Sequence, residues 1–284
     1  MSSIRGGSPT ERIIDSPHNA TLRRIRALER DPGERRRSGL YIAWGLHLAQ
    51  EALDQGAPLR EALVGPRLED SDAGRLALRR LQRLHVTIHR TTTRLLESTV
   101  EGSGDQGILL VVPRPDLLLA QLLEAAPSLL LAAHGIQDPG NLGSIIRTAR
   151  AFGAGAVVVL EGCTDPFGSR AVRAAMGAQF GFAVTVAGTR AGLEAFATGR
   201  MQIVAADPGG PVPPTEVDLR RPTVLLVGAE GAGLPRALLE AAAVRVGIPM
   251  APGPASLNVH AAAAVLLYEA ARQRRFGAPG GAPR

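Results

Sequence analysis

Three stretches of the chain place small polar residues directly after apolar runs of strand length. They are residues 134–154, 225–235 and 248–269, and all three are rich in small residues. Open α/β sheets bind ligands at the carboxyl ends of their strands, so these stretches are candidates for a site. The side chains there that could act on a ligand are Asn141, Arg147, Glu230, Ser256 and Asn258. Such groups can orient two reactants and stabilise charge without a metal or a covalent nucleophile.

The glycines among these residues do not form a nucleotide-binding signature. Gly228, Gly231 and Gly233 have the spacing G-x-x-G-x-G, which is the wrong order for the dinucleotide fingerprint. No glycine-rich loop is followed by Lys and then Ser or Thr, so a P-loop is absent. The six His and one Cys lack ligand spacing, and we predict no metal site. His85 and His89 lie in a strand-like run, where they would share a face.

Each candidate also has a purely structural interpretation. Asn141 and Ser256 are both suited to cap the helix that follows, because their side chains can accept from backbone N–H groups. Arg147 could pair with a surface neighbour. Because a guanidinium is already protonated at neutral pH, it is a poor proton acceptor, and we expect Arg147 to anchor phosphate and stabilise charge. We expect Glu230, which small residues flank, to position Arg147 or another arginine.

Helices and strands alternate along the whole chain. Continuous apolar runs such as residues 128–134 are typical of strands buried on both faces of a parallel sheet. We therefore predict an α/β protein whose C-terminal part holds a parallel sheet. The expected strands lie near residues 40, 61–65, 85–89, 108–112, 128–134, 156–160, 182–186, 201–206, 223–228 and 244–249. The expected helices lie at 16–29, 73–83, 171–178, 191–198, 235–242 and 257–275. A further helix is expected to end at residue 53, and another to begin at about residue 142.

The length of 284 residues is sufficient for two domains, each with its own core. We divide the chain into a first α/β domain (1–115), a linker (116–127), a second α/β domain (128–276) and a Gly/Pro-rich tail (277–284). Apolar residues make up 45% and charged residues 20%, which argues against a disordered chain. Aromatic residues are only 3%, which weighs against a sheet that stacks RNA bases on several rings.

All the basic residues are arginine, and the formal net charge of +6 favours an anionic partner. The largest local excess lies in residues 1–40, with nine Arg against five acids. Arginine can hold a phosphate with two donors at once, although a short basic run more often forms a solvated surface. The candidates for phosphate contacts in this segment are Arg23, Arg24, Arg35, Arg36 and Arg37.

Features that would direct the chain to a membrane or an oxidising compartment are missing from the sequence. Cys163 is the single cysteine, so no internal disulfide can form, and we expect it to be a small packing residue. The first residues lack the apolar segment of a signal peptide. The Leu-rich stretch 117–133 contains Gln121, Glu124 and Pro127, which makes it too polar to span a bilayer. We expect a soluble, cytoplasmic protein.

Taken together, three motifs resemble those of the SpoU/TrmH family of RNA 2′-O-ribose methyltransferases, within the SPOUT superfamily. The motifs are 141–149 (NLGSIIRTA), 227–234 (VGAEGAGL), and 248–250 (IPM) followed by 256–259 (SLNV). The resemblance extends over residues 128–276. It implies transfer of a methyl group from S-adenosylmethionine to a ribose 2′-hydroxyl of RNA. Large-subunit (23S) ribosomal RNA is favoured over transfer RNA as the substrate.

By motif matching, the resemblance also implies which residues form the site. It assigns catalytic roles to Arg147, Asn141, Glu230, Ser256 and Asn258. The contacts to S-adenosylmethionine fall to Gly228, Gly231, Ile248, Met250, Leu257 and Asn258, several of them through the backbone. Arg147 joins the N-terminal arginines as an RNA-binding residue, and no metal is required.

The resemblance further implies a deep trefoil knot at the C-terminal end of the second domain, and a homodimer formed through that domain. Knots are nearly absent from proteins, so sequence patterns alone would not suggest one. The first domain is similar to a ribosomal-protein-like domain that binds the RNA substrate. Two residues depart from the family pattern. Trp44 stands where the family usually has Glu, and His260, expected to lie on a helix face, replaces a small residue.

Other functions remain open alongside this one. A related knotted enzyme could methylate a base, but Asn141 together with Arg147 argues against it. A conventional Rossmann-type methyltransferase is disfavoured by the order of the glycines. A transfer-RNA 2′-O-methyltransferase, or methylation of ribosomal RNA that confers antibiotic resistance, would use the same residues. The chain could also be a non-catalytic RNA-binding or ribosome-assembly factor that retains the fold, although the intact Arg147, Glu230 and Asn258 weigh against this.

Overall fold

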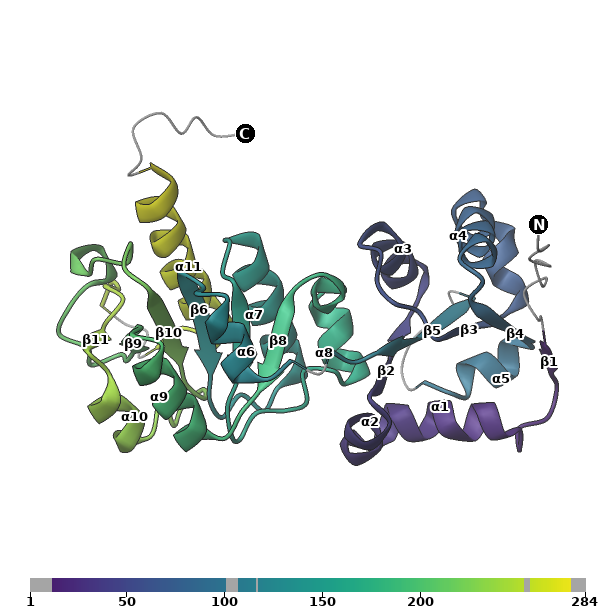
Figure 1. The fold of residues 1–284 in the computed structure, drawn as a ribbon, viewed down its shortest axis with the longest axis horizontal. Helices are drawn as coiled ribbons and strands as arrows, with labels where there is room; N and C mark the ends of the chain where they lie inside the picture. Colours follow the sequence, from purple (N-terminus) through teal and green to yellow (C-terminus); the bar gives the residue numbers. More distant parts are fainter. Residues whose placement is uncertain (1–11, 101–106, 116, 253–255, 277–284) are drawn as a thin grey trace, which may run out of the picture. The chain divides into compact units, whose positions relative to one another are not determined.

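The structure, a computed structural model, describes residues 12–100, 107–115, 117–252 and 256–276. It contains two compact units (Figure 1). The first comprises residues 1–115 and 167–181, and the second comprises residues 116–166 and 182–284. The segment 167–181 therefore groups with the N-terminal unit, although the chain on both sides of it belongs to the second unit. The tail predicted at 277–284 lies outside the described residues.

The first unit contains a five-stranded mixed sheet in the order β1-β4-β3-β5-β2. Its first three members run parallel, and β5 is antiparallel to both of its neighbours. The strands are β1 (Arg12–Ile14), β2 (Leu40–Trp44), β3 (Glu61–Val64), β4 (Thr87–Thr91) and β5 (Ile108–Pro113). The helices are α1 (Ala20–Arg30), α2 (Pro32–Ser38), α3 (Leu46–Asp54), α4 (Asp72–Arg83), α5 (Thr93–Glu97) and α8 (Ser169–Ala174).

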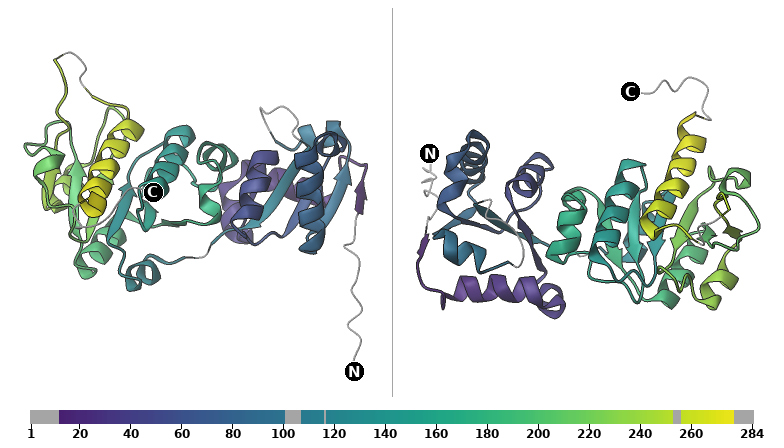
Figure 2. Two further views of the ribbon diagram at one scale, coloured as in Figure 1. Left: turned by 90° about the horizontal axis from the view of Figure 1, so that it is seen from above. Right: turned by 180° about the vertical axis from the view of Figure 1, so that it is seen from behind.

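Helices cover both faces of this sheet, with α1 and α5 on one side and α3 and α4 on the other (Figure 2). The regular spacing of Leu22, Ile25 and Leu28 predicts the buried side of α1, and all three are fully buried against the sheet. Trp44 lies in the same core. Its burial makes it a packing residue at the end of β2.

The second unit contains a six-stranded sheet in the order β11-β9-β10-β6-β7-β8, with every strand parallel to its neighbours. The predicted parallel sheet is therefore confirmed. The strands are β6 (Leu129–Ala133), β7 (Ala156–Val159), β8 (Ala183–Val186), β9 (Gln202–Ala206), β10 (Thr223–Val227) and β11 (Val244–Val246). The helices are α6 (Leu119–Glu124), α7 (Pro139–Ala151), α9 (Thr189–Thr198), α10 (Arg236–Ala241) and α11 (Val259–Phe276).

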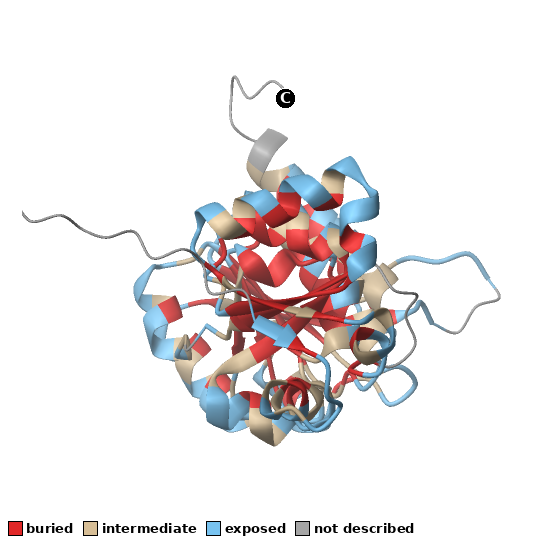
Figure 3. Ribbon diagram, turned by 90° about the vertical axis from the view of Figure 1, so that its right-hand side faces the viewer, coloured by how far each residue is buried: buried red, intermediate tan, exposed pale blue. Residues whose placement is uncertain are grey.

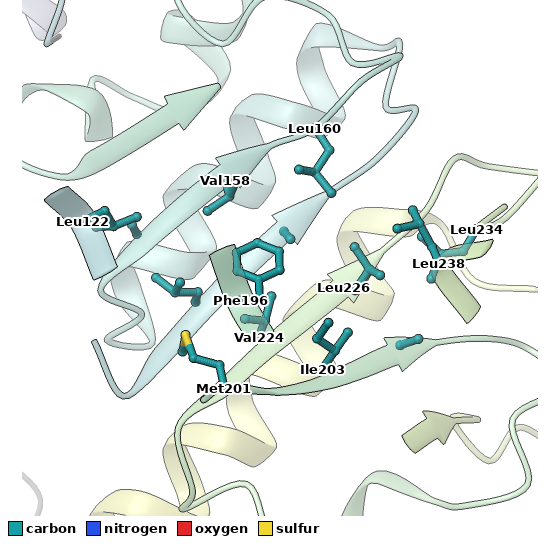
Figure 4. Close-up of a cluster of buried hydrophobic side chains, with 14 residues drawn as sticks. Leu122, Val158, Leu160, Phe196, Met201, Ile203, Val224, Leu226, Leu234 and Leu238 are labelled. Carbon is teal, nitrogen blue, oxygen red and sulfur yellow. The ribbon is translucent and has the colours of Figure 1, made fainter. Parts of the chain in front are cut away.

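Both faces of the second sheet are buried, as its continuous apolar strands predict. Alternate residues of the strands pack against α6, α9 and α10, where Phe196 fills the centre of the cluster (Figure 4). The opposite face is covered by α7 and α11, which also pack against each other. Buried residues accordingly follow the strands, while the helices carry one buried and one exposed side (Figure 3). This arrangement leaves the carboxyl ends of the strands free to form a site.

Some elements differ from the sequence-based prediction. The strand β1 and the short helices α2 and α5 were not predicted, because segments of three to seven residues carry little periodicity. The expectation that His85 and His89 share a strand face is wrong. His85 lies in a turn with a positive φ of 55°, and only His89 belongs to β4.

Candidate functional site

A cavity of about 350 Å³ opens in the second unit at the carboxyl ends of β9, β10 and β11. Its walls come from the loops that follow these strands and from the start of α11. Five of the six residues predicted to contact the cofactor line it, and Asn258 lies immediately beside it. The lining residues from that prediction are Gly228, Gly231, Ile248, Met250 and Leu257.

The loop after β10 is a tight turn that only glycine permits. A side chain at Gly228 would place its Cβ 2.5 Å from the carbonyl carbon of Gly233, which is a collision with backbone. Gly231 and Gly233 have positive φ values of 78° and 66°, which L-residues rarely adopt. The N–H of Gly233 donates to the carbonyl of Ala229 at 2.9 Å and closes the turn. The loop therefore presents backbone, with little side-chain bulk, to the cavity.

Three residues from the three motifs meet at the rim of this cavity. The side-chain amide of Asn141 donates to the Glu230 carboxylate at 3.0 Å. The amide of Asn258 donates to the same oxygen, Oε1, and also to the carbonyl oxygen of Asn141 at 3.2 Å. The backbone N–H of Val259 is a further donor to that carboxylate, at 3.4 Å. We call this set, Asn141, Glu230 and Asn258, the amide–carboxylate cluster.

The cluster corrects the expectation for Glu230. In the described part of the chain, no hydrogen bond or ion pair joins Glu230 to an arginine, and its partners are the two amides and the first N–H of α11. A carboxylate at this position also interacts favourably with the positive end of the helix dipole. Glu230 therefore fixes the start of α11 against the first turn of α7.

The helix caps also differ from the prediction. Asp138, not Asn141, caps α7, and its carboxylate accepts from the N–H of Asn141 at 2.7 Å. Asn258, not Ser256, caps α11, with its side-chain oxygen accepting from the N–H of His260 at 2.9 Å. Ser256 lies exposed in the cavity wall. Asn141 is thus freed from capping, so that its side chain is available to the cluster.

Arg147 lies on α7 nearly two turns after Asn141 and is exposed. Its guanidinium forms no hydrogen bond or ion pair with the residues that the structure describes, and it is not among the residues lining the cavity. The next residue, Thr148, hydrogen bonds through Oγ1 to Nε2 of His260 at 2.9 Å. This hydrogen bond joins α7 to α11. Arg147, the residue before Thr148, remains available to a ligand.

Sequence reasoning missed Asp207, which lies in the cavity wall directly after β9. Its carboxylate forms an ion pair with Arg245 of β11 and accepts from the N–H of Gly209 at 3.1 Å. Its position at the carboxyl end of a predicted strand was the signal that could have identified it.

The N-terminal arginines do not form one phosphate-binding set. Arg35 is buried and donates to the carbonyls of Leu28 and Glu29 at 2.5 and 2.9 Å, so it secures the end of α1 and is removed from the candidates. Arg24 pairs with Glu61, and Arg37 with Glu34 and Asp31. Arg23 and Arg36 are exposed, and their guanidinium groups form no hydrogen bond or ion pair within the described residues.

Cys163 is half-buried, and burial raises the pKa of its thiol. Its Sγ donates to the carbonyl of Ala133 at 3.2 Å and accepts from the N–H of Ile136 at 3.3 Å. The thiol therefore links the loops after β6 and β7 while remaining protonated. Across the described ranges, no group of three His, Cys, Asp or Glu side chains is placed to hold a metal ion. No helix in these ranges has the length and hydropathy needed to cross a membrane.

Comparison with known proteins identifies relatives of the chain. Residues 128–268 match the SpoU rRNA Methylase family. The chain is 32% identical over 279 residues to a protein of Mycobacterium ulcerans named an uncharacterized tRNA/rRNA methyltransferase, and the match covers 96% of this chain and 90% of that protein.

Solved structures share the fold over almost the whole chain. An S-adenosylmethionine-bound rRNA methyltransferase from Sinorhizobium meliloti superposes with a TM-score of 0.78 at 28% identity, covering 93% of this chain and 98% of the other. A structure described as an RNA 2′-O ribose methyltransferase superposes with a TM-score of 0.75 at 29% identity, covering 92% and 99%. Both units of the chain therefore have counterparts in these structures.

Proposed function

Because the chain belongs to the SpoU family of RNA methyltransferases, we propose that it methylates a ribose 2′-hydroxyl of RNA, and of large-subunit ribosomal RNA in particular. The observation that carries this proposal is the amide–carboxylate cluster at the rim of the cavity. It joins one residue from each of the three motifs. A ligand in the cavity would therefore lie next to the start of α7, the helix that carries Arg147.

The residues present fit S-adenosylmethionine as the methyl donor. The cavity volume of about 350 Å³ lies within the range of small-molecule sites, roughly 300–1,000 Å³. The absence of side chains at Gly228 and Gly231 leaves room for a ligand to approach the backbone, and Ile248, Met250 and Leu257 offer apolar contacts. The sulfonium of this cofactor supplies an activated methyl group. A homologous structure contains the same cofactor.

The polar residues have distinct roles in this proposal. Asn141 and Asn258 position the ribose and the donor, and Glu230 holds both amides in place. Arg147 binds RNA phosphate and stabilises charge during transfer, since a guanidinium does not accept a proton at neutral pH. The hydroxyl proton passes to solvent or to an RNA phosphate. Alignment and exclusion of water by the cavity loops then supply most of the rate enhancement.

We assign the first unit, most of which is formed by residues 1–115, to binding of the RNA substrate. Its exposed Arg23 and Arg36 can contact phosphate, in keeping with the net positive charge of the chain. The choice of ribosomal RNA rests on the family description and on the homologous rRNA methyltransferase from Sinorhizobium meliloti. The single cysteine is consistent with action in the cytoplasm.

We also propose that the second unit is knotted and forms a homodimer. The contact of Asn258 with the loop after β10 and with the first turn of α7 supports a knot. For the dimer, α11 exposes Val265 and Tyr268, which are 41% and 53% accessible. Tyr268 also contacts Phe152 edge-on, with ring centroids 6.0 Å apart. An apolar stripe of this kind on a helix suits an interface between two copies.

The decisive experiment offers tritiated S-adenosylmethionine and total RNA from a deletion strain to the purified protein. A 2′-O-methyl group blocks alkaline cleavage of RNA, so labelled sites are then mapped by their resistance to alkali. Arg147→Ala is the matched control.

A new alkali-resistant position in large-subunit ribosomal RNA is the expected result. Label in transfer RNA would support the alternative substrate. Label without alkali resistance would overturn ribose methylation. No label, and no heat of S-adenosylmethionine binding, would instead indicate a non-catalytic RNA-binding factor.

A further inference from the structure

Residues 167–181 form part of the first unit, where they lie along its edge strand. Strand β2 has only one neighbour in the sheet, β5, and α8 packs against β2. Phe167, just before α8, is buried against Tyr41 with ring centroids 5.2 Å apart. The hydroxyl of Ser169 donates to Glu29 of α1 at 2.8 Å. At the other end, Gly177 lies close to the side chain of Glu51 in α3. The segment thus runs from α1 to α3 beside β2.

The outward face of this segment is basic. Helix α8 turns Ala171 and Val172 inward, while Arg170 and Arg173, three residues apart, are exposed on the other side. Within the described residues, neither guanidinium has a hydrogen-bond or ion-pair partner. Arg114 lies close by, with its guanidinium 4.8 Å above the ring of Phe167. Glu29, an acidic residue next to α8, accepts a hydrogen bond from Ser169.

We propose that α8, through Arg170 and Arg173, is an RNA-binding element that acts with the first unit to hold the phosphate backbone of the substrate. The proposal rests on the function proposed above and extends its substrate contacts to a segment that lies outside the three motifs and outside the N-terminal arginines. The exposed guanidinium groups can each bind a phosphate bidentately. The buried Ala171 and Val172 hold α8 against β2, so the helix does not need to become ordered when RNA binds.

The test compares Arg170→Gln/Arg173→Gln with a matched control, Arg79→Gln/Arg83→Gln. The control pair lies on α4 of the same unit, is exposed, forms no hydrogen bond or ion pair with the described residues and removes the same charge. Binding of a fluorescein-labelled RNA stem-loop and of protein-free ribosomal RNA is measured by anisotropy over a series of salt concentrations. We expect the α8 variant to bind at least roughly tenfold more weakly, with the slope of log affinity against log salt reduced by about two. The control should remain within about twofold of the wild type.

Failure of this inference can be separated from failure of the proposed function. Both variants should keep the wild-type circular dichroism, melting temperature and S-adenosylmethionine affinity, because α8 does not line the cavity. If the wild type methylates RNA but the α8 variant binds RNA with unchanged affinity and salt slope, the inference is overturned while the function stands. Equal weakening in the control would also overturn it. If the wild type neither binds nor methylates RNA, the proposed function fails first.

Discussion

The side-chain amide of Asn141 donates a hydrogen bond of 3.0 Å to Glu230, although 89 residues separate the two along the chain. The same carboxylate oxygen accepts from Asn258, so the third motif is held by the same group. One acidic residue in the loop after β10 therefore connects the start of α7 to the start of α11. Removing its charge should disturb both helix starts at once.

Glu230→Gln removes the negative charge, so Asn141 and Asn258 would donate to a neutral carbonyl oxygen, and the NH2 group that replaces the other carboxylate oxygen cannot accept a hydrogen bond. Hydrogen bonds to a charged group contribute about 1.5–3 kcal/mol each, so we expect S-adenosylmethionine affinity to fall by roughly 10- to 100-fold. Isothermal titration calorimetry measures it. The control is Glu240→Gln, an exposed residue paired with Arg236 on α10. Wild-type affinity in Glu230→Gln would refute the role given to the cluster.

Arg147→Ala should separate methyl transfer from cofactor binding. The guanidinium has no partner among the described residues and does not line the cavity, so its loss should leave S-adenosylmethionine affinity and the melting temperature unchanged. Loss of one preorganised charge-stabilising donor costs roughly 10²–10³ in rate. Single-turnover methylation of ribosomal RNA measures this, with Arg190→Ala on α9 as the control. A variant with reduced cofactor affinity would instead indicate a structural role.

Gly228→Ala should close the cavity by steric conflict, because its Cβ would lie 2.5 Å from the carbonyl carbon of Gly233. We expect at least a roughly tenfold loss of S-adenosylmethionine affinity and a lower melting temperature. Gly209→Ala is the control. It lies in a loop beside the cavity, where the nearest atom to an added Cβ is 3.8 Å away. Equal behaviour of the two variants in calorimetry would contradict the collision argument.

The buried Glu61 predicts how stability depends on pH. Burial raises its pKa, but the hydrogen bond with His89 and the charge and hydrogen bond of Arg24 together lower it by more, so the pKa lies below its ordinary value of 4.5. Its stabilisation is therefore present above about pH 4.5 and is lost as the pH falls through the lowered pKa. Glu61→Gln should reduce the free energy of unfolding at neutral pH by about 1–3 kcal/mol, and by less at acidic pH.

Urea denaturation at a series of pH values measures this difference. Glu194→Gln, an exposed residue on α9, is the control and should remain within about 0.5 kcal/mol of the wild type at each pH. A gap between wild type and Glu61→Gln that stays constant or widens on acidification would contradict a lowered pKa in the folded protein.

Tyr268→Asp tests the proposed dimer. Tyr268 is 53% accessible on α11, and a charge there would be buried without a partner in an interface between two copies. We expect light scattering after size exclusion to give a dimer mass for the wild type and half that mass for the variant. Arg236→Asp, on the exposed side of α10, is the control. A monomeric wild type would exclude this interface, as would a variant that remains fully dimeric.

The sequence by itself determined the features that depend on local pattern. Apolar runs located the strands of the parallel sheet, since a strand buried on both faces needs apolar residues throughout. The motif residues after β10 and β11 indicated two of the loops that form the cavity, and Asn141, in the motif that follows β6, lies at its rim, because parallel strands bring their carboxyl ends to one edge. The family could also be identified from these segments alone.

Only the tertiary structure decided which side chains meet. The capping roles of Asp138 and Asn258, and the two amides as partners of Glu230, became visible only once the helix starts and the loop after β10 were placed in space. Burial of Arg35 depends on where α1 ends, which spacing alone does not fix. The grouping of residues 167–181 with the first unit depends on Phe167 packing against Tyr41, more than a hundred residues earlier. Such contacts arise from packing between residues that are far apart in the chain. A sequence pattern reports local preferences for helix or strand, and it does not indicate which distant residues will pack together.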